Sequence, residues 1–167
     1  MQGIVLQRKE HAGEAIITYS FYDNKFASGN LVVRKLYMAM LTSVEQRLSH
    51  IEVEYNDLMV AETLGKRAAE VLQRLGATKD NLRENRSGDT IVSRIFRSEL
   101  TEDRYSYLYY FDDLARLAHY SFLEEDVTRV HFYFSQYLEL QIPLAEEENF
   151  YQELTNAQVP YKLIRTK

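Results

Sequence analysis

The chain contains 167 residues, of which 46% are hydrophobic and 27% are charged, a composition that supports one folded domain and excludes an intrinsically disordered chain. Cysteine is absent, which excludes disulfides, thiolate metal sites and cysteine nucleophiles. Residues 1–100 carry 14 basic and 13 acidic side chains, whereas residues 101–167 carry 6 and 12, so the second part lacks the positive charge that phosphate binding needs.

The first elements in chain order are two short strands. Ile4 and Leu6 alternate with polar residues, residues 10–13 supply a turn, and residues 15–22 are rich in β-branched and aromatic side chains, a pattern typical of a β-hairpin. The apolar run over residues 4–6 is too short for a signal sequence or a membrane span. We therefore expect a soluble, cytoplasmic protein.

A helix and a further strand follow. Apolar residues recur every three or four positions at Val33, Leu36, Met40, Val44 and Leu48. This spacing predicts a helix over residues 31–49. Residues 51–55 alternate between apolar side chains and glutamate, which predicts a strand with one face in water.

A second helical stripe comes next. Its members are Leu58, Ala61, Leu64, Ala68, Val71 and Leu75. Asn56 or Asp57 is the expected N-cap and Gly76 the expected end, while Gly65 inside the stripe is interpreted as a point of close helix packing. Residues 77–89 turn polar, and we expect an exposed, mobile loop there with one short helical turn.

The next segments are a strand over residues 90–100 and then an aromatic region. Between Tyr105 and Tyr151 the chain places 13 of its 21 tyrosine and phenylalanine residues. Alternation after Tyr105 fits a strand, but a helical stripe also runs through this region. The residues of that stripe are Leu108, Phe111, Ala115, Ala118 and Phe122. We predict a strand that ends near Phe111 and a helix over residues 112–124.

The remaining sequence predicts a second hairpin, a helix and an edge strand. Residues 130–134 and 138–142 alternate, Pro143 ends the second strand, and three glutamates at residues 146–148 suit the first turn of a helix. Residues 159–164 are predicted to return as an edge strand. The expected fold class is α+β, with antiparallel hairpins and about four helices in a single domain over residues 1–167.

No catalytic, nucleotide-binding or metal motif is recognisable. His119 and His131 lie near acidic residues, but without the spacing of metal ligands, so a solvated turn is the simpler interpretation. Asp112 and Asp113 are adjacent and point apart on a helix, which favours helix capping over a catalytic dyad. The sequence indicates no cofactor and no metal, and favours a non-enzymatic protein.

One basic segment, residues 66–97, leaves a hypothesis of single-stranded nucleic-acid binding open, because folding could bring its arginines against tyrosines. A solvated helix and loop would give the same composition. We therefore do not expect nucleic acid as a partner.

The leading hypothesis is a protein-interaction or regulatory module that works as a homo-oligomer or with another protein. Tyrosine gives large contact area at little cost in rotamer entropy, and the tyrosines here are interleaved with acidic residues. If they lie on a strand, every second ring is exposed. The predicted contact residues are Tyr105, Tyr107, Tyr109, Tyr110, Tyr133 and Tyr137.

The alternative is a ligand-binding or catalytic α+β domain with a pocket lined by tyrosine and arginine. Tyrosine hydroxyls together with Arg97 or Arg104 could bind an anionic small molecule through hydrogen bonds and bidentate charge pairing. No spacing in the sequence selects between the two hypotheses.

Overall fold

The computed structural model describes residues 3–166 and shows an α+β fold in which the strands form one sheet. The strands are β1 (Ile4–His11), β2 (Glu14–Ser20), β3 (His50–Tyr55), β4 (Arg83–Ser87), β5 (Thr90–Glu99), β6 (His119–Glu124), β7 (Val127–Tyr133), β8 (Tyr137–Pro143) and β9 (Tyr161–Arg165). Their order across the sheet is β4-β5-β3-β6-β7-β8-β2-β1-β9. Neighbours are antiparallel except β1 and β9, which run parallel.

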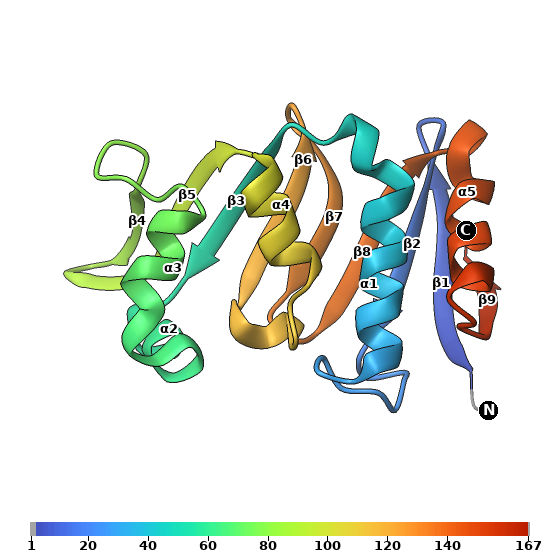
Figure 1. The fold of residues 1–167 in the computed structure, drawn as a ribbon, viewed down its shortest axis with the longest axis horizontal. Helices are drawn as coiled ribbons and strands as arrows, with labels where there is room; N and C mark the ends of the chain where they lie inside the picture. Colours follow the sequence, from blue (N-terminus) through green and yellow to red (C-terminus); the bar gives the residue numbers. More distant parts are fainter. Residues whose placement is uncertain (1–2, 167) are drawn as a thin grey trace.

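The helices lie together on one face of this sheet (Figure 1). They are α1 (Leu31–Val44), α2 (Asp57–Leu64), α3 (Ala68–Arg74), α4 (Glu102–Tyr109) and α5 (Glu147–Asn156). We call the side of the sheet that they cover the helical face and the other side the open face. Because α2 and α3 are two parts of one predicted helix, the predicted α+β fold with about four helical units is confirmed.

The core lies between the sheet and the helices, and strand alternation explains it. In β3, Ile51 and Val53 are buried on the helical face, whereas Glu52 and Glu54 are partly exposed on the open face. Tyr37 of α1 is fully buried there, and its hydroxyl donates a hydrogen bond to a backbone carbonyl of α4 at 2.8 Å. One face of β3 is therefore apolar, as the period-2 pattern requires.

Most of the locally encoded elements are confirmed. The β1–β2 and β7–β8 hairpins, the helix that begins at Leu31, the strand before Tyr55 and the final helix all form where the sequence predicts them. Asn30 and Asn56 cap α1 and α2 by accepting backbone N–H bonds. The predicted last strand is β9, an edge strand beside β1.

The prediction for residues 105–124 is wrong. The chain is helical over α4, which Thr101 caps by accepting the backbone N–H of Arg104, with two acidic residues in its first turn. Residues 112–124 form a short 3-10 turn and then β6, because β6 pairs on both sides, with β3 and β7. Asp113 still acts as a cap, by accepting the backbone N–H of Ala115.

Two further predictions need correction. The expected loop over residues 77–89 contains β4, which pairs with β5 and exposes all five of its side chains, so it has no apolar alternation to reveal it. Gly65 is not a packing point, since within the described part of the chain no atom of another segment lies within 4 Å of where its Cβ would be. Its positive φ of 64° instead ends α2 and separates it from α3.

Candidate ligand-binding cleft

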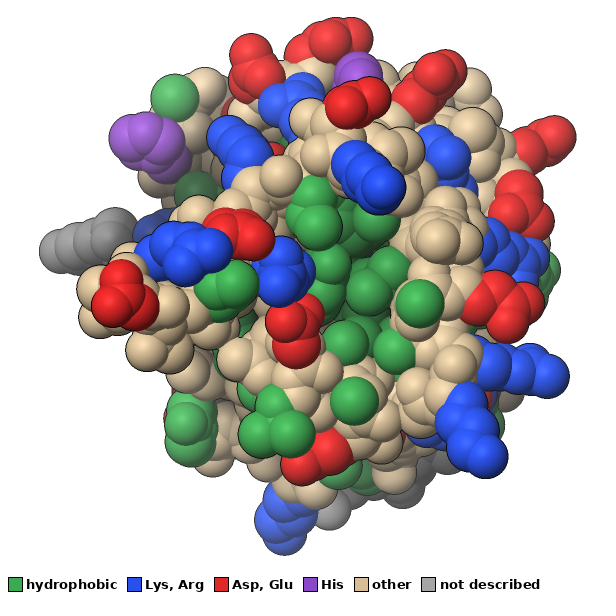
Figure 2. Space-filling model, turned by 90° about the vertical axis from the view of Figure 1, so that its left-hand side faces the viewer, with side chains coloured by type: hydrophobic (Ala, Val, Ile, Leu, Met, Phe, Trp, Pro, Cys, Tyr) green, Lys and Arg blue, Asp and Glu red, His purple; other side chains and the backbone are tan. Residues whose placement is uncertain are grey.

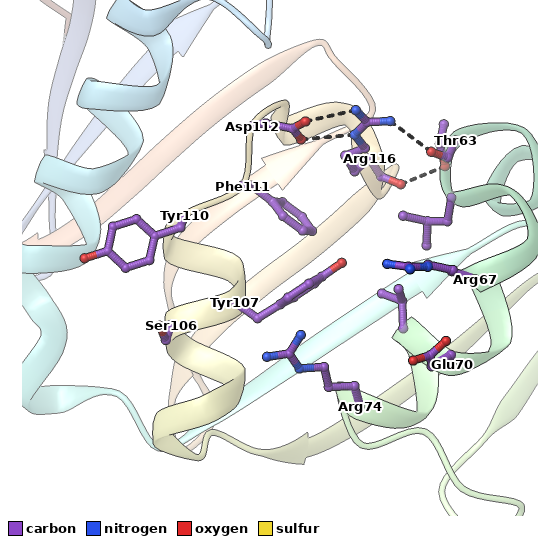
Figure 3. A pocket seen from close by; sticks show the side chains of 12 residues that line it. Thr63, Arg67, Glu70, Arg74, Ser106, Tyr107, Tyr110, Phe111, Asp112 and Arg116 are labelled. Carbon is purple, nitrogen blue, oxygen red and sulfur yellow. Dashed lines mark hydrogen bonds and ion pairs between the residues drawn. The ribbon is translucent and has the colours of Figure 1, made fainter.

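A cleft of about 530 Å³ lies between α2–α3 and α4 on the helical side of the molecule (Figure 3). Its walls are Thr63, Leu64, Arg67, Glu70, Val71 and Arg74 on one side and Ser106, Tyr107, Tyr110, Phe111, Asp112 and Arg116 on the other. Its volume falls in the range of small-molecule sites, and three arginines line it.

Backbone contacts hold the two walls in place. Arg104 of α4 donates to the carbonyl of Arg74 at 3.1 Å and to the carbonyl of Glu99 at 2.8 Å, which ties the C-terminus of α3 to the end of β5 and to α4. Gly76 follows with φ +105°, and a Cβ there would lie 2.5 Å from the Cβ of Ser98. Only glycine therefore allows the chain to leave α3 along this path.

Two of the three arginines are already paired. Arg74 donates to both carboxylate oxygens of Asp103, at 2.9 and 3.1 Å, and its guanidinium lies 4.6 Å from the centre of the Tyr107 ring. Arg116 makes the same bidentate contact with Asp112, at 3.0 and 3.1 Å, and also donates to the carbonyl of Thr63. Both side chains are fixed by these bonds and form the rim of the cleft.

Arg67 differs from the other two arginines. Within residues 3–166 its guanidinium makes no ion pair, and it points across the cleft toward Tyr107 (Figure 3). The residue is exposed, so its five donor groups face solvent and the space of the cleft. An anion placed there would contact the planar guanidinium of Arg67, which has no ion-pair partner within residues 3–166.

The ionisation states of the side chains around Arg67 support its availability to an anion. Burial raises the pKa of Tyr107, so its hydroxyl is a neutral hydrogen-bond donor at neutral pH. Hydrogen bonds from Arg116 lower the pKa of Asp112, and hydrogen bonds from Arg74 lower the pKa of Asp103. Both carboxylates are therefore ionised and occupied by their arginines. Among the cations that line the cleft, this leaves Arg67 without an ion pair in residues 3–166, with Glu70 on the same wall.

The side chains of the cleft can bind an anionic ligand. A guanidinium can clasp a carboxylate or phosphate bidentately, and a phenol can add one hydrogen bond to it. Leu64, Val71 and Phe111 supply apolar wall for the body of a ligand. The cleft thus suits a small molecule with an anionic end and an apolar or aromatic body.

The predicted contact tyrosines do not form one surface. Tyr107 and the 70% exposed Tyr110 line the cleft, whereas Tyr105 and Tyr109 stack on each other at 5.6 Å against the core. By strand alternation, Tyr133 lies on the open face. The sixth tyrosine, Tyr137, stacks on Tyr133 at 5.3 Å. The predicted binding residue Arg104 has the structural role described above.

Arg97 lies away from the cleft. It is on the open face of β5, opposite Glu52, and pairs with Asp126 at 2.9 Å. Arg86 and Arg94 of the basic segment share Glu84 as an ion-pair partner. The structure therefore does not bring Arg97 to the tyrosines of α4, as stacking of nucleic-acid bases between them would require.

The two histidines singled out in the sequence meet on the open face. Nε2 of His119 lies 2.6 Å from Nε2 of His131, and Nδ1 of His119 lies 2.8 Å from a carboxylate oxygen of Glu54. Although burial opposes it, hydrogen bonds from Ser93 and His119 keep the pKa of Glu54 below its usual value. This contact is not predictable from the sequence, because Glu54 lies far from both histidines along the chain and the β6–β7 hairpin that brings the histidines together replaces a predicted helix.

The arginines of the cleft were missed, although a signal was present. Leu64, Arg67, Val71 and Arg74 recur at spacings of three and four residues, which places two cations and two apolar side chains on one side of a helical segment. That pattern on its own indicates an amphipathic face. Only the fold shows that α4 stands opposite with Tyr107.

Residues 3–166 contain no helix long and apolar enough to cross a bilayer, and no cluster of three or more histidine, aspartate or glutamate side chains placed to hold a metal ion. No family model, curated protein or solved structure matches the chain.

Proposed function

We propose that this protein binds a small anionic molecule in the cleft between α2–α3 and α4. The observation that carries the proposal is the guanidinium of Arg67, which faces Tyr107 across the cleft with no carboxylate partner in residues 3–166. A ligand carboxylate or phosphate would complete the ion pair that Arg74 and Arg116 already make within the protein.

Phenyl phosphate is a suitable first probe, because it joins a dianion to an aromatic ring. Titration followed by amide NMR should give shifts confined to residues 63–74 and 106–116. Arg67→Gln should weaken binding by about tenfold to a hundredfold, since a hydrogen bond to a charged group contributes about 1.5–3 kcal/mol. Lys66→Gln is the matched control, because Lys66 is an exposed neighbour outside the cleft.

The apolar wall makes a separate contribution that the same assay measures. Inorganic phosphate should bind more weakly than phenyl phosphate, because it leaves Leu64, Val71 and Phe111 in contact with water. Scattered shifts, or equal affinity of the Arg67→Gln and Lys66→Gln variants, would contradict the proposal. Mass spectrometry of the purified protein should also detect any copurifying anion.

A second function that we propose is association with another protein or with a second copy of the chain. The observation in its favour is that β4 ends the sheet with an unpaired outer edge within residues 3–166. The exposed Tyr110 and the Tyr133–Tyr137 stack remain predicted contact residues. A cytoplasmic location, consistent with the lack of cysteine, belongs to the same proposal.

A further inference from the structure

Strand β4 forms an exposed edge at one end of the sheet (Figure 1). Within residues 3–166 it pairs only with β5, and all five of its side chains are exposed. A strand edge presents a row of backbone donors and acceptors that another strand can use. A register irregularity lies between Asn85 and Arg86, where β5 has one extra residue, Val92, so the β4 chain itself is continuous.

An apolar hollow opens near this edge, between α3, the end of β3 and the segment that leads into β4. Figure 2 views the molecule from this end and shows hydrophobic side chains gathered in a central depression with charged side chains around it. A groove of about 270 Å³ here is lined by Tyr55, Ala69, Leu72, Gln73, Ala77, Thr78, Lys79 and Leu82. The end of the core between sheet and helices is therefore open.

The charges of β4 are complementary to those of a second β4. Its sequence is Arg83-Glu84-Asn85-Arg86-Ser87. In an antiparallel pair centred on Asn85, Glu84 of each copy lies opposite Arg86 of the other, and Asn85 lies opposite itself. Such a pair is self-complementary, as a two-fold interface must be, and opposite charges across a strand pair are stabilising.

We propose that two copies of this chain associate through antiparallel pairing of their β4 strands. This inference rests on the second function above and names the partner and the contact. A two-fold axis perpendicular to the sheet places both sets of helices on the same side, so the two apolar hollows face each other across the axis. The paired strands and the hollows together bury the open end of each core.

Intrachain bonds already hold the charged side chains at this edge. Glu84 accepts from Arg94 at 2.9 Å and forms an ion pair with Arg86 at 2.7 Å. In the dimer each glutamate gains the arginine of the other copy as a further neighbour. A five-residue strand pair is a small interface, so we expect a weak dimer, with a dissociation constant on the order of micromolar.

Charge reversal tests the register directly. Glu84→Arg places arginine opposite arginine in a homodimer, and Arg86→Glu places glutamate opposite glutamate. Each variant alone should dissociate at least about tenfold more readily than the wild type, because two like-charge pairs replace two ion pairs. An equimolar mixture of the two variants restores both ion pairs and should form a heterodimer.

Sedimentation velocity and native mass spectrometry over about 1 μM to 1 mM would measure these states. Lys162→Glu on β9, the opposite edge of the sheet, is the control and should dimerise like the wild type. Circular dichroism establishes that each variant is folded. A wild type that stays monomeric at every concentration overturns the proposal, and so do single variants that dimerise unchanged or a mixture that does not associate.

The ligand proposal is tested separately in the same proteins. Neither Glu84 nor Arg86 lines the cleft, so both charge-reversal variants should bind phenyl phosphate with wild-type affinity. Loss of association together with unchanged binding of phenyl phosphate would show that the substitutions affect the β4 interface and not the cleft. Failure of phenyl phosphate to bind the wild type would leave the dimer test unaffected.

Discussion

His131 should make the stability of this protein depend on pH between about 6.5 and 4. Its ring lies on the open face beside His119, with the two Nε2 atoms 2.6 Å apart, and Glu139 is its neighbour on β8. Burial, and then the positive charge of His119, lower the pKa of His131 from 6.5 to about 4. The native state therefore favours the neutral ring, whereas the unfolded chain accepts a proton.

The sign and size of the effect follow from linkage. Above pH 6.5 the ring is neutral in both the native and the unfolded state, and its contribution to stability is fully present. As pH falls toward 4, only the unfolded state gains the proton, so the free energy of unfolding decreases. The shift corresponds to an upper limit of about 3.4 kcal/mol. Because the ring is partly accessible to solvent, which screens the effect, we expect about half of that.

Urea unfolding of the wild type and of His131→Gln at several pH values between about 7 and 4.5 would measure this contribution. The difference in unfolding free energy between the two proteins should change by about 1.5–2 kcal/mol across that range. Carboxylates such as Glu54, with a lowered pKa, lose their contribution only as pH falls below about 4.5, and they do so in both proteins. Parallel pH profiles, or an NMR titration of His131 near 6.5, would refute the reasoning.

Further predictions concern the framework around the site, and urea unfolding at neutral pH checks each of them. Arg129→Met should lower the free energy of unfolding by about 3–5 kcal/mol, because it leaves two carboxylates without their nearly buried partner. A decrease of less than about 1 kcal/mol would contradict this. Gly76→Ala should cost more than about 2 kcal/mol through positive φ and contact with Ser98, whereas Gly65→Ala, with open space around it, should cost about 1 kcal/mol. Asn56→Ala should cost about 1 kcal/mol, because two backbone N–H groups at the start of α2 lose their acceptor.

Elements with local signals were predictable from the sequence. The β1–β2 hairpin has a glycine turn between alternating segments, and α1 has both an apolar stripe and the Asn30 cap, so neighbouring residues alone specify them. Helix α4 also had local signals, in the Thr101 cap and the acidic first turn. Its alternating tyrosines also fit a strand, which is why the sequence-based prediction differs from the helix in the structure.

Strands β4 and β6 depend on partners that the local sequence does not reveal. Residues 119–124 become a strand because β3 and β7 lie on either side, although their apolar spacing also fits a helix. In β4 the side chains are exposed on both faces, so no hydrophobic pattern marks the strand. In β6, long-range pairing overrides a local preference for helix. In β4, long-range pairing alone specifies the strand, because the local sequence shows no preference.

The stripe over residues 58–75 shows why the cleft itself could not be predicted. Its periodicity indicated one buried face, yet Leu58 is 70% exposed, and Leu64 and Val71 line the cleft. The buried side chain of α3 is Leu72, which lies outside the stripe. An apolar helical face packs equally well against a core or against a ligand, since burial removes it from water in both cases. Only the position of α4, set by Arg104 and by β5, decides that this face borders a cavity and that Arg67 points into it.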